Sequence, residues 1–189
     1  MRLFVAIEIP PAHRAEIERR LLARRGAWPA ARWVRAEILH VTLAFLGEVD
    51  GAQVDALAGG LARGVQSVAP RRLAWTAAGA FPERGPARVL WLGLDGDPKL
   101  AAIHDAIVGA ARGAGLLVAG AGAFRPHLTV ARCPRPWPRA AVDGFRGAFA
   151  EPVGEPFETS EAVLFESQLG PAGPHHRAIA RLPFSGTSC

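Results

Sequence analysis

Residues 39–46 read LHVTLAFL, and this stretch decides the fold because it describes a strand with two unlike faces. Side chains two residues apart in a strand project to the same side. One predicted face is aliphatic and aromatic, and it is made of Leu39, Val41, Leu43 and Phe45. The other face carries His40 and Thr42, followed by the small residue Ala44. The strand is therefore predicted to bury one face and to present a histidine and a threonine on the other.

The same pattern returns 87 residues later in FRPHLTVAR, residues 124–132. His127 and Thr129 fall on one predicted face, with Ala131 after them. Two imidazoles with pKa values near neutrality can divide acid–base work, one taking a proton while the other gives one. Threonine hydroxyls can donate hydrogen bonds to phosphate oxygens that gain charge in the transition state. The two tetrads predict metal-independent chemistry on a phosphodiester and leave open which histidine is the acid.

The pattern of strands and helices predicts an α+β fold. Apolar runs and alternation predict strands at 3–9, 39–46, 73–81, 89–94, 126–131, 157–165 and 177–182. Helices are predicted after Pro10-Pro11, after an Asp50 cap, after Asp97-Pro98 and around residues 142–149. The segments 73–81 and 89–94 read as a hairpin, which favours antiparallel sheets packed against helices.

Length and composition indicate one domain over residues 1–189, with a frayed tail at 185–189. The net charge is +5, and the basic residues are arginines except for Lys99, which suits a phosphate or nucleic-acid partner. Two cysteines without a C-x-x-C motif predict no disulfide framework. The N-terminal apolar run is too short for a signal peptide or a membrane span. We expect a cytoplasmic monomer with no cofactor, no metal and no membrane contact.

The tetrads HVTL and HLTV resemble those of the 2H phosphoesterase superfamily, and most closely its LigT/ThpR-like RNA 2′,3′-cyclic phosphodiesterases. The likeness extends to RLFVAIEIP (2–10), LHVTLAFLGEV (39–49) and RVLWLGL (88–94), and it spans nearly the whole chain. It implies two similar lobes around a central cleft, each a mainly antiparallel sheet with helices on its outer face. It also implies hydrolysis of RNA 2′,3′-cyclic phosphate ends to 2′-phosphate.

Carried onto this sequence, the resemblance makes His40 the proton donor and His127 the proton acceptor, with Thr42 and Thr129 holding the phosphate. Arg132 stands where the family often has a ligand-contacting arginine. Strict alternation puts Arg132 on the face opposite His127, so that contact requires the strand to end or twist near Ala131. Arg125 shares the His127 face by parity and is a second candidate for ligand binding.

Two other readings remain open. One is a cyclic phosphodiesterase for a small nucleotide, such as an ADP-ribose cyclic phosphate or a 2′,5′-linked oligoadenylate. The other is an RNA-binding module without turnover, which intact tetrads disfavour. The dipeptide His175-His176 reads as an exposed loop, and His13 and His104 as surface residues. Four aromatic residues are candidates for stacking on bases, namely Trp33, Trp91, Trp137 and Phe124.

Overall fold

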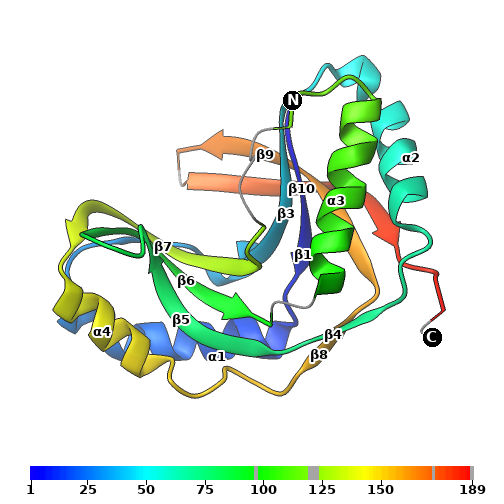
Figure 1. Cartoon of the computed structure of the whole chain (residues 1–189). Coiled ribbons are helices and arrows are strands. Elements are labelled where there is room, and N and C mark those ends of the chain that lie inside the picture. Colours follow the sequence, from blue (N-terminus) through cyan, green and yellow to red (C-terminus); the bar gives the residue numbers. More distant parts are fainter. Residues whose placement is uncertain (96–97, 119–123, 172, 188–189) are drawn as a thin grey trace.

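The computed structural model describes residues 1–95, 98–118, 124–171 and 173–187 (Figure 1). The helices are α1 (Pro11–Arg24), α2 (Val54–Val65), α3 (Pro98–Gly113) and α4 (Arg139–Ala148). The strands are β1 (Arg2–Glu8), β2 (Arg32–Trp33), β3 (His40–Glu48), β4 (Arg71–Leu73), β5 (Trp75–Phe81), β6 (Ala87–Leu94), β7 (His127–Trp137), β8 (Phe157–Thr159), β9 (Glu161–Gly170) and β10 (Gly173–Pro183). None of the helices in the described ranges is long and apolar enough to cross a membrane.

The main sheet has the strand order β10-β9-β1-β3-β7-β6-β5, with β2 added beside β7, and β4 pairs with β8 separately. Every strand pair is antiparallel. The strands β3 and β7 meet through the pair Val41–Leu128, which divides the sheet into two halves. The α+β class and its two antiparallel halves are confirmed, and the two predicted histidine-bearing strands lie next to each other at the junction.

Helices cover the outer face of each half (Figure 1). The helices α2 and α3 pack on each other, on β10 and on β3, whereas α4 packs on β5 and β6. The apolar stripe of α3 is fully buried at Leu100, Ile103, Ile107 and Ala111. These helices fill the side of the sheet that faces away from the histidines.

Helix α1 starts at the predicted proline, and its buried residues are spaced four apart. His13, Ile17 and Leu21 are buried, whereas Leu22 is 52% exposed. The Trp75 indole NH donates to His13 Nδ1 at 3.2 Å, so His13 is a core residue and its expected surface position is wrong. Positions four apart share a helix face, and long-range packing selected this set over the adjacent leucine.

Two local expectations at chain segments are corrected. Strand β7 continues through the proline-rich segment to Trp137, which pairs with Ala87 of β6. The Trp137 side chain is buried and packs near Trp28 and Trp33. The tail is held at its start, since Ser185 N–H donates to the Gln66 carbonyl (3.1 Å). The predicted cap Asp97 and the end of the tail at 188–189 lie outside the described residues.

Candidate active site

The junction pair Val41–Leu128 brings the two tetrads together. Both side chains are completely buried in the main core. The residues that flank them, His40 and Thr42 on β3 and His127 and Thr129 on β7, are half-buried and lie on the opposite face. The four polar side chains predicted from two distant stretches therefore meet around one backbone pair.

Each histidine is oriented by the carbonyl group two residues before it. The Nδ1–H of His40 donates to the Ile38 carbonyl at 2.7 Å, and the Nδ1–H of His127 donates to the Arg125 carbonyl at 2.8 Å. A carbonyl oxygen can only accept, so Nδ1 carries the proton in the neutral ring and Nε2 keeps its lone pair. In His40 that Nε2 accepts from the Thr42 hydroxyl at 3.1 Å. Both rings thus offer Nε2 for proton transfer.

Aromatic rings surround the two histidines differently. The His40 ring lies 4.9 Å from Phe4 and 5.1 Å from His176, centroid to centroid. The His127 ring meets Phe81 edge-on at 5.2 Å, and Trp91 lies 6.3 Å away. His40 therefore has another imidazole as its neighbour, whereas the neighbours of His127 are the rings of Phe81 and Trp91.

Burial lowers the pKa of His40 from its ordinary 6.5 to about 4. The positive charges of His176 and His127 lower the pKa further, while the hydrogen bond to the Ile38 carbonyl raises it. Burial also lowers the pKa of His176. In the free protein at neutral pH, His40 is consequently an uncharged imidazole.

Each histidine-bearing strand has an unpaired residue at the equivalent place, three positions after its histidine. In β3 the register shifts at Leu43, since Val5 pairs with Ala44 and Ala6 with Thr42. Leu43 and Ala44 are both buried as a result, and Phe45 turns to the histidine face with 52% of its surface exposed. The expected positions of Ala44 and Phe45 are therefore exchanged, because a β-bulge reverses the alternation beyond it.

The bulge in β7 falls at Val130, since Leu90 pairs with Ala131 and Trp91 with Thr129. Ala131 is fully buried, and Arg132 is exposed on the histidine face. The strand does not end near Ala131. Because the bulge reverses the alternation, Arg132 lies on the same face as His127, whereas strict alternation would put it on the opposite face.

Long-range hydrogen bonds satisfy the carbonyl groups of both bulge residues. The His104 Nδ1–H donates to the Leu43 carbonyl at 2.7 Å, and the Val34 backbone N–H donates to the Val130 carbonyl at 2.9 Å. A buried carbonyl without a partner is costly, so these bonds support the bulges. The expected surface role of His104 is wrong, because its ring is half-buried and stacks on Phe124 at 4.6 Å.

The two candidate arginines have different surroundings. The Arg125 guanidinium forms an ion pair with Glu83 in the β5–β6 loop. Arg132 forms no ion pair within the part of the chain that the structure describes. Among the stacking candidates, Trp137 is in the core, whereas Trp91 lies beside His127 on the open face.

His176 lies beside the candidate site, where the sequence analysis did not place it. It lies in β10 opposite Ser167, not in an exposed loop, and its ring contacts both His40 and Phe4. A cavity of about 200 Å³ adjoins this cluster, and its lining includes Glu8, Arg14, Glu37, His40 and His176. The two-residue spacing of His176 and Ala178 was the available signal for a strand. The glycines and prolines before them indicated a loop instead.

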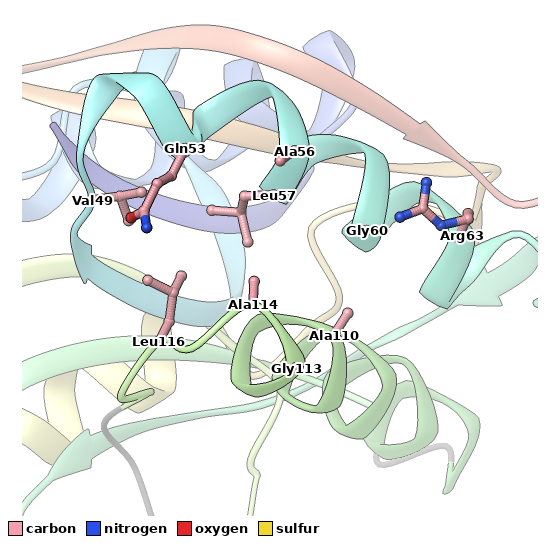
Figure 2. A pocket seen from close by; sticks show the side chains of 10 residues that line it. All are labelled: Val49, Gln53, Ala56, Leu57, Gly60, Arg63, Ala110, Gly113, Ala114 and Leu116. Atoms are coloured by element: carbon pink, nitrogen blue, oxygen red, sulfur yellow. The ribbon is translucent and has the colours of Figure 1, made fainter.

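A larger cavity of about 440 Å³ lies elsewhere, between α2 and α3 (Figure 2). Its lining residues are Val49, Gln53, Ala56, Leu57, Gly60, Arg63, Ala110, Gly113, Ala114 and Leu116. None of the candidate site residues borders it. Within the described ranges, no group of three or more His, Cys, Asp or Glu side chains is placed to hold a metal ion.

Residues 5–168 match the family model of the 2′-5′ RNA ligase superfamily, and the chain belongs to this family. It is 30% identical to a protein of Archaeoglobus fulgidus named RNA 2′,3′-cyclic phosphodiesterase, over 95% of this chain and 98% of that protein. A Thermotoga maritima protein of the same name is 27% identical, over 98% and 97% of the two chains.

Solved structures agree with the fold. The structure of TT0787 from Thermus thermophilus superposes with a TM-score of 0.81 at 26% identity, covering 100% of both chains. The structure of Escherichia coli LigT in complex with 3′-AMP gives a TM-score of 0.77 at 26% identity, covering 97% of this chain and 98% of LigT.

Proposed function

We propose that this protein hydrolyses the 2′,3′-cyclic phosphate ends of RNA or oligonucleotides to 2′-phosphate ends. The observation that carries the proposal is the placement of two His–Thr pairs on one sheet face around Val41–Leu128. The relatives from Archaeoglobus fulgidus and Thermotoga maritima, named as RNA 2′,3′-cyclic phosphodiesterases, support the substrate class. We further propose that the enzyme acts in the cytoplasm as a monomer, without a metal or another cofactor.

In the proposed reaction, water attacks phosphorus and the bond from phosphorus to the 3′ oxygen breaks. His127 Nε2 takes a proton from the water, and His40 Nε2–H gives a proton to the departing 3′ oxygen. The hydroxyls of Thr42 and Thr129 donate to the nonbridging oxygens, which gain charge as the bond to water forms. Product release leaves a 2′-phosphate and a free 3′ hydroxyl.

The low pKa of His40 sets a condition on its role as donor. A neutral imidazole at pH 7 cannot give a proton to the leaving oxygen, so His40 must become protonated when substrate binds. The bound phosphate anion favours the imidazolium, because an opposite charge nearby raises the pKa of histidine. In this mechanism, substrate binding therefore promotes the protonation of His40, the general acid.

We propose Arg132 as a ligand contact, because its exposed side chain lies on the histidine face. Arg125 acts through its main chain, whose carbonyl holds His127 in the tautomer with a free Nε2. Its guanidinium is engaged with Glu83. This division assigns substrate binding to the bulged part of β7 and histidine orientation to the residues before it.

Hydrolysis of a nucleoside 2′,3′-cyclic phosphate, with and without EDTA, tests the proposal, with the product position assigned by ³¹P NMR. We expect a 2′-phosphate, no effect of chelator, and at least about a hundredfold loss of kcat in His40→Ala and His127→Ala. Full activity in either variant contradicts the two-histidine mechanism. Binding without turnover by wild type would instead favour an RNA-binding module.

A further inference from the structure

Two arginines face each other on neighbouring strands close to the histidines. Arg32 on β2 pairs with Arg132 on β7. Residues paired in this way project to the same face, with Cβ atoms about 4.5–5.5 Å apart, and like charges there repel. Both side chains are exposed, and in the described ranges the ion pairs of arginine all involve other residues. The pair is a positive site to which the described part of the chain supplies no paired carboxylate.

The face on which these arginines lie follows from the pairing of strands. Arg132 pairs with Val89, and Val89 pairs with Phe81. The Phe81 ring meets His127 at 5.2 Å, so all these side chains share the histidine face. The next residue in β2, Trp33, projects the other way and packs near Trp28 with ring centroids 5.7 Å apart. Arg32 is consequently a neighbour of the catalytic face and not of the core.

The spacing along β6 places this arginine pair two strand residues away from Thr129, the proposed phosphate-binding threonine. Thr129 pairs with Trp91 and Arg132 pairs with Val89, two residues further along a regular strand. Two residues of strand span about 7 Å. This length is comparable to the distance between neighbouring phosphates on one nucleic-acid strand. A nucleotide whose cyclic phosphate lies at Thr129 can therefore place its 5′ phosphate near the arginines.

We propose that Arg32 and Arg132 together bind the phosphate on the 5′ side of the terminal nucleotide. Guanidinium groups suit this role because their planar donors match phosphate oxygens in bidentate fashion. The preferred substrates are then RNA or oligonucleotide ends, and nucleoside cyclic phosphates without a 5′ phosphate are poor ones. This inference rests on the proposed function, since it takes the cyclic phosphate to lie between the histidines.

The two halves of the site also differ in a way that gives the substrate a direction. The position in β3 that corresponds to Arg132 is Phe45, which follows the equivalent bulge and is 52% exposed. An exposed phenyl ring offers no charge to a phosphate. The nucleic-acid backbone therefore leaves the histidines along β7 and β2, toward Arg132 and Arg32, and not along β3.

Calorimetric binding tests the anion site without any need for turnover. We expect a nucleoside 3′,5′-bisphosphate to bind wild type about tenfold or more tightly than the 3′-monophosphate, as charge-assisted hydrogen bonds to a second phosphate predict. Arg32→Gln should lose this preference, and Arg32→Lys should recover part of it. Arg112→Gln removes the same charge from an exposed position on α3 and should keep the preference.

Kinetics with three substrates then link the site to catalysis. The substrates are a nucleoside 2′,3′-cyclic phosphate with a 5′ hydroxyl, the same compound with a 5′ phosphate, and a dinucleotide ending in a cyclic phosphate. We expect kcat/KM to be higher for the two substrates that carry the 5′-side phosphate, and the ratio to fall about tenfold in Arg32→Gln but not in Arg112→Gln. The dinucleotide distinguishes a phosphodiester from a terminal phosphate as the occupant.

Each failure has a distinct meaning. Equal affinity of wild type for the bisphosphate and the monophosphate overturns the arginine site, as does a preference that survives in a folded Arg32→Gln protein. A preserved bisphosphate preference without hydrolysis of any of the three substrates overturns the proposed function and leaves the anion site standing. The melting temperature of Arg32→Gln, measured beside wild type, verifies that the variant is folded.

Discussion

Val41 lies directly opposite Leu128 and joins the two halves of the main sheet, with both side chains fully buried. The histidine and threonine of each tetrad flank this pair on the other face. The register of one backbone pair therefore determines how far apart the two imidazoles stand. The pair Val41–Leu128 therefore contributes to core packing on one side of the sheet and to the geometry of the candidate active site on the other.

Truncating this junction should damage stability and activity together. We expect Leu128→Ala to lower the free energy of unfolding by about 2–5 kcal/mol, because it leaves a cavity in the core. Leu22→Ala, at a position that is 52% exposed, should change it by less than about 0.5 kcal/mol. Urea unfolding gives both values. A loss in Leu128→Ala no larger than that in Leu22→Ala contradicts the role of the junction.

We also propose that residues 1–189 form one domain, although in the described residues the two halves of the main sheet are joined by pairing between β3 and β7 alone. Helix α1 follows β1 of the first half but packs on the second, where His13 accepts from Trp75. Helix α3 follows β6 of the second half but packs on the first, where His104 donates to Leu43. Circular dichroism and tryptophan fluorescence should therefore report one coincident unfolding transition. Two separated transitions would contradict a single domain.

Stability should fall as the pH drops from about 6.5 toward 4. The pKa of His40 is about 4 in the folded protein and 6.5 ordinarily, so the unfolded chain binds more protons in this range. The stabilising effect is complete above pH 6.5 and amounts to about 3 kcal/mol for this shift. Unfolding free energies measured from pH 5 to 7 should have a smaller slope in His40→Gln. An unchanged slope would falsify the low pKa of His40.

The slope that remains in His40→Gln has its own source. Burial lowers the pKa values of His13 and His176 as well, and these groups act in the same direction. The carboxylate of Glu16, whose pKa is held at about 2 by hydrogen bonds from Arg19 and Arg20, contributes only at lower pH. The interval from pH 5 to 7 therefore isolates the histidines.

Substrate binding should take up a proton at pH 6. His40 is neutral in the free protein and becomes charged beside the phosphate anion in the proposed mechanism. Calorimetry with His127→Ala, in buffers of different ionisation enthalpy, measures the uptake when a nucleoside 2′,3′-cyclic phosphate binds. Adding His40→Gln to that variant should abolish the uptake. Binding of the cyclic phosphate without net uptake contradicts His40 as the donor.

The position of the Trp91 indole beside His127 requires a glycine at residue 79, against which the indole packs. A Cβ at Gly79 would lie 2.2 Å from Trp91 Cζ2, so Gly79→Ala must displace the indole from beside His127. We expect a loss of about 1–3 kcal/mol in stability and a reduced kcat. Gly109→Ala, in the open on α3, should stabilise by about 0.5–1 kcal/mol. Melting curves and activity of both variants provide the comparison, and an active, stable Gly79→Ala protein rules out this dependence.

Much of the architecture was predictable from local patterns. The apolar stripe of α2 at Val54, Leu57, Leu61 and Val65 is buried as its spacing indicates, and the hairpin of β5 and β6 forms where two strand patterns flank a loop. Both signals depend on the fixed periods of helix and strand, which a single segment already contains. The face shared by each histidine and threonine was predicted for the same reason.

The bulges and the long-range neighbours were not predictable in this way. Ala44 and Ala131 fit either face of a strand, so no local signal marks the residue at which the alternation reverses. His176 reached the site because β10 pairs with β9, despite turn-forming residues before it. Such features arise from pairing between segments that are distant in the chain, and this pairing overrides local preference.

By itself, the sequence determined which groups are available: two His–Thr pairs, each on the polar face of a strand, because side-chain alternation is a local property of the backbone. Tertiary structure decided which of them meet and what surrounds them. It brought His40 beside His176, turned Arg132 to the histidine face and set Arg32 across from it. The two tetrads are nearly symmetric in sequence, but burial and cross-strand neighbours differ between the halves, and these differences distinguish the two histidines chemically.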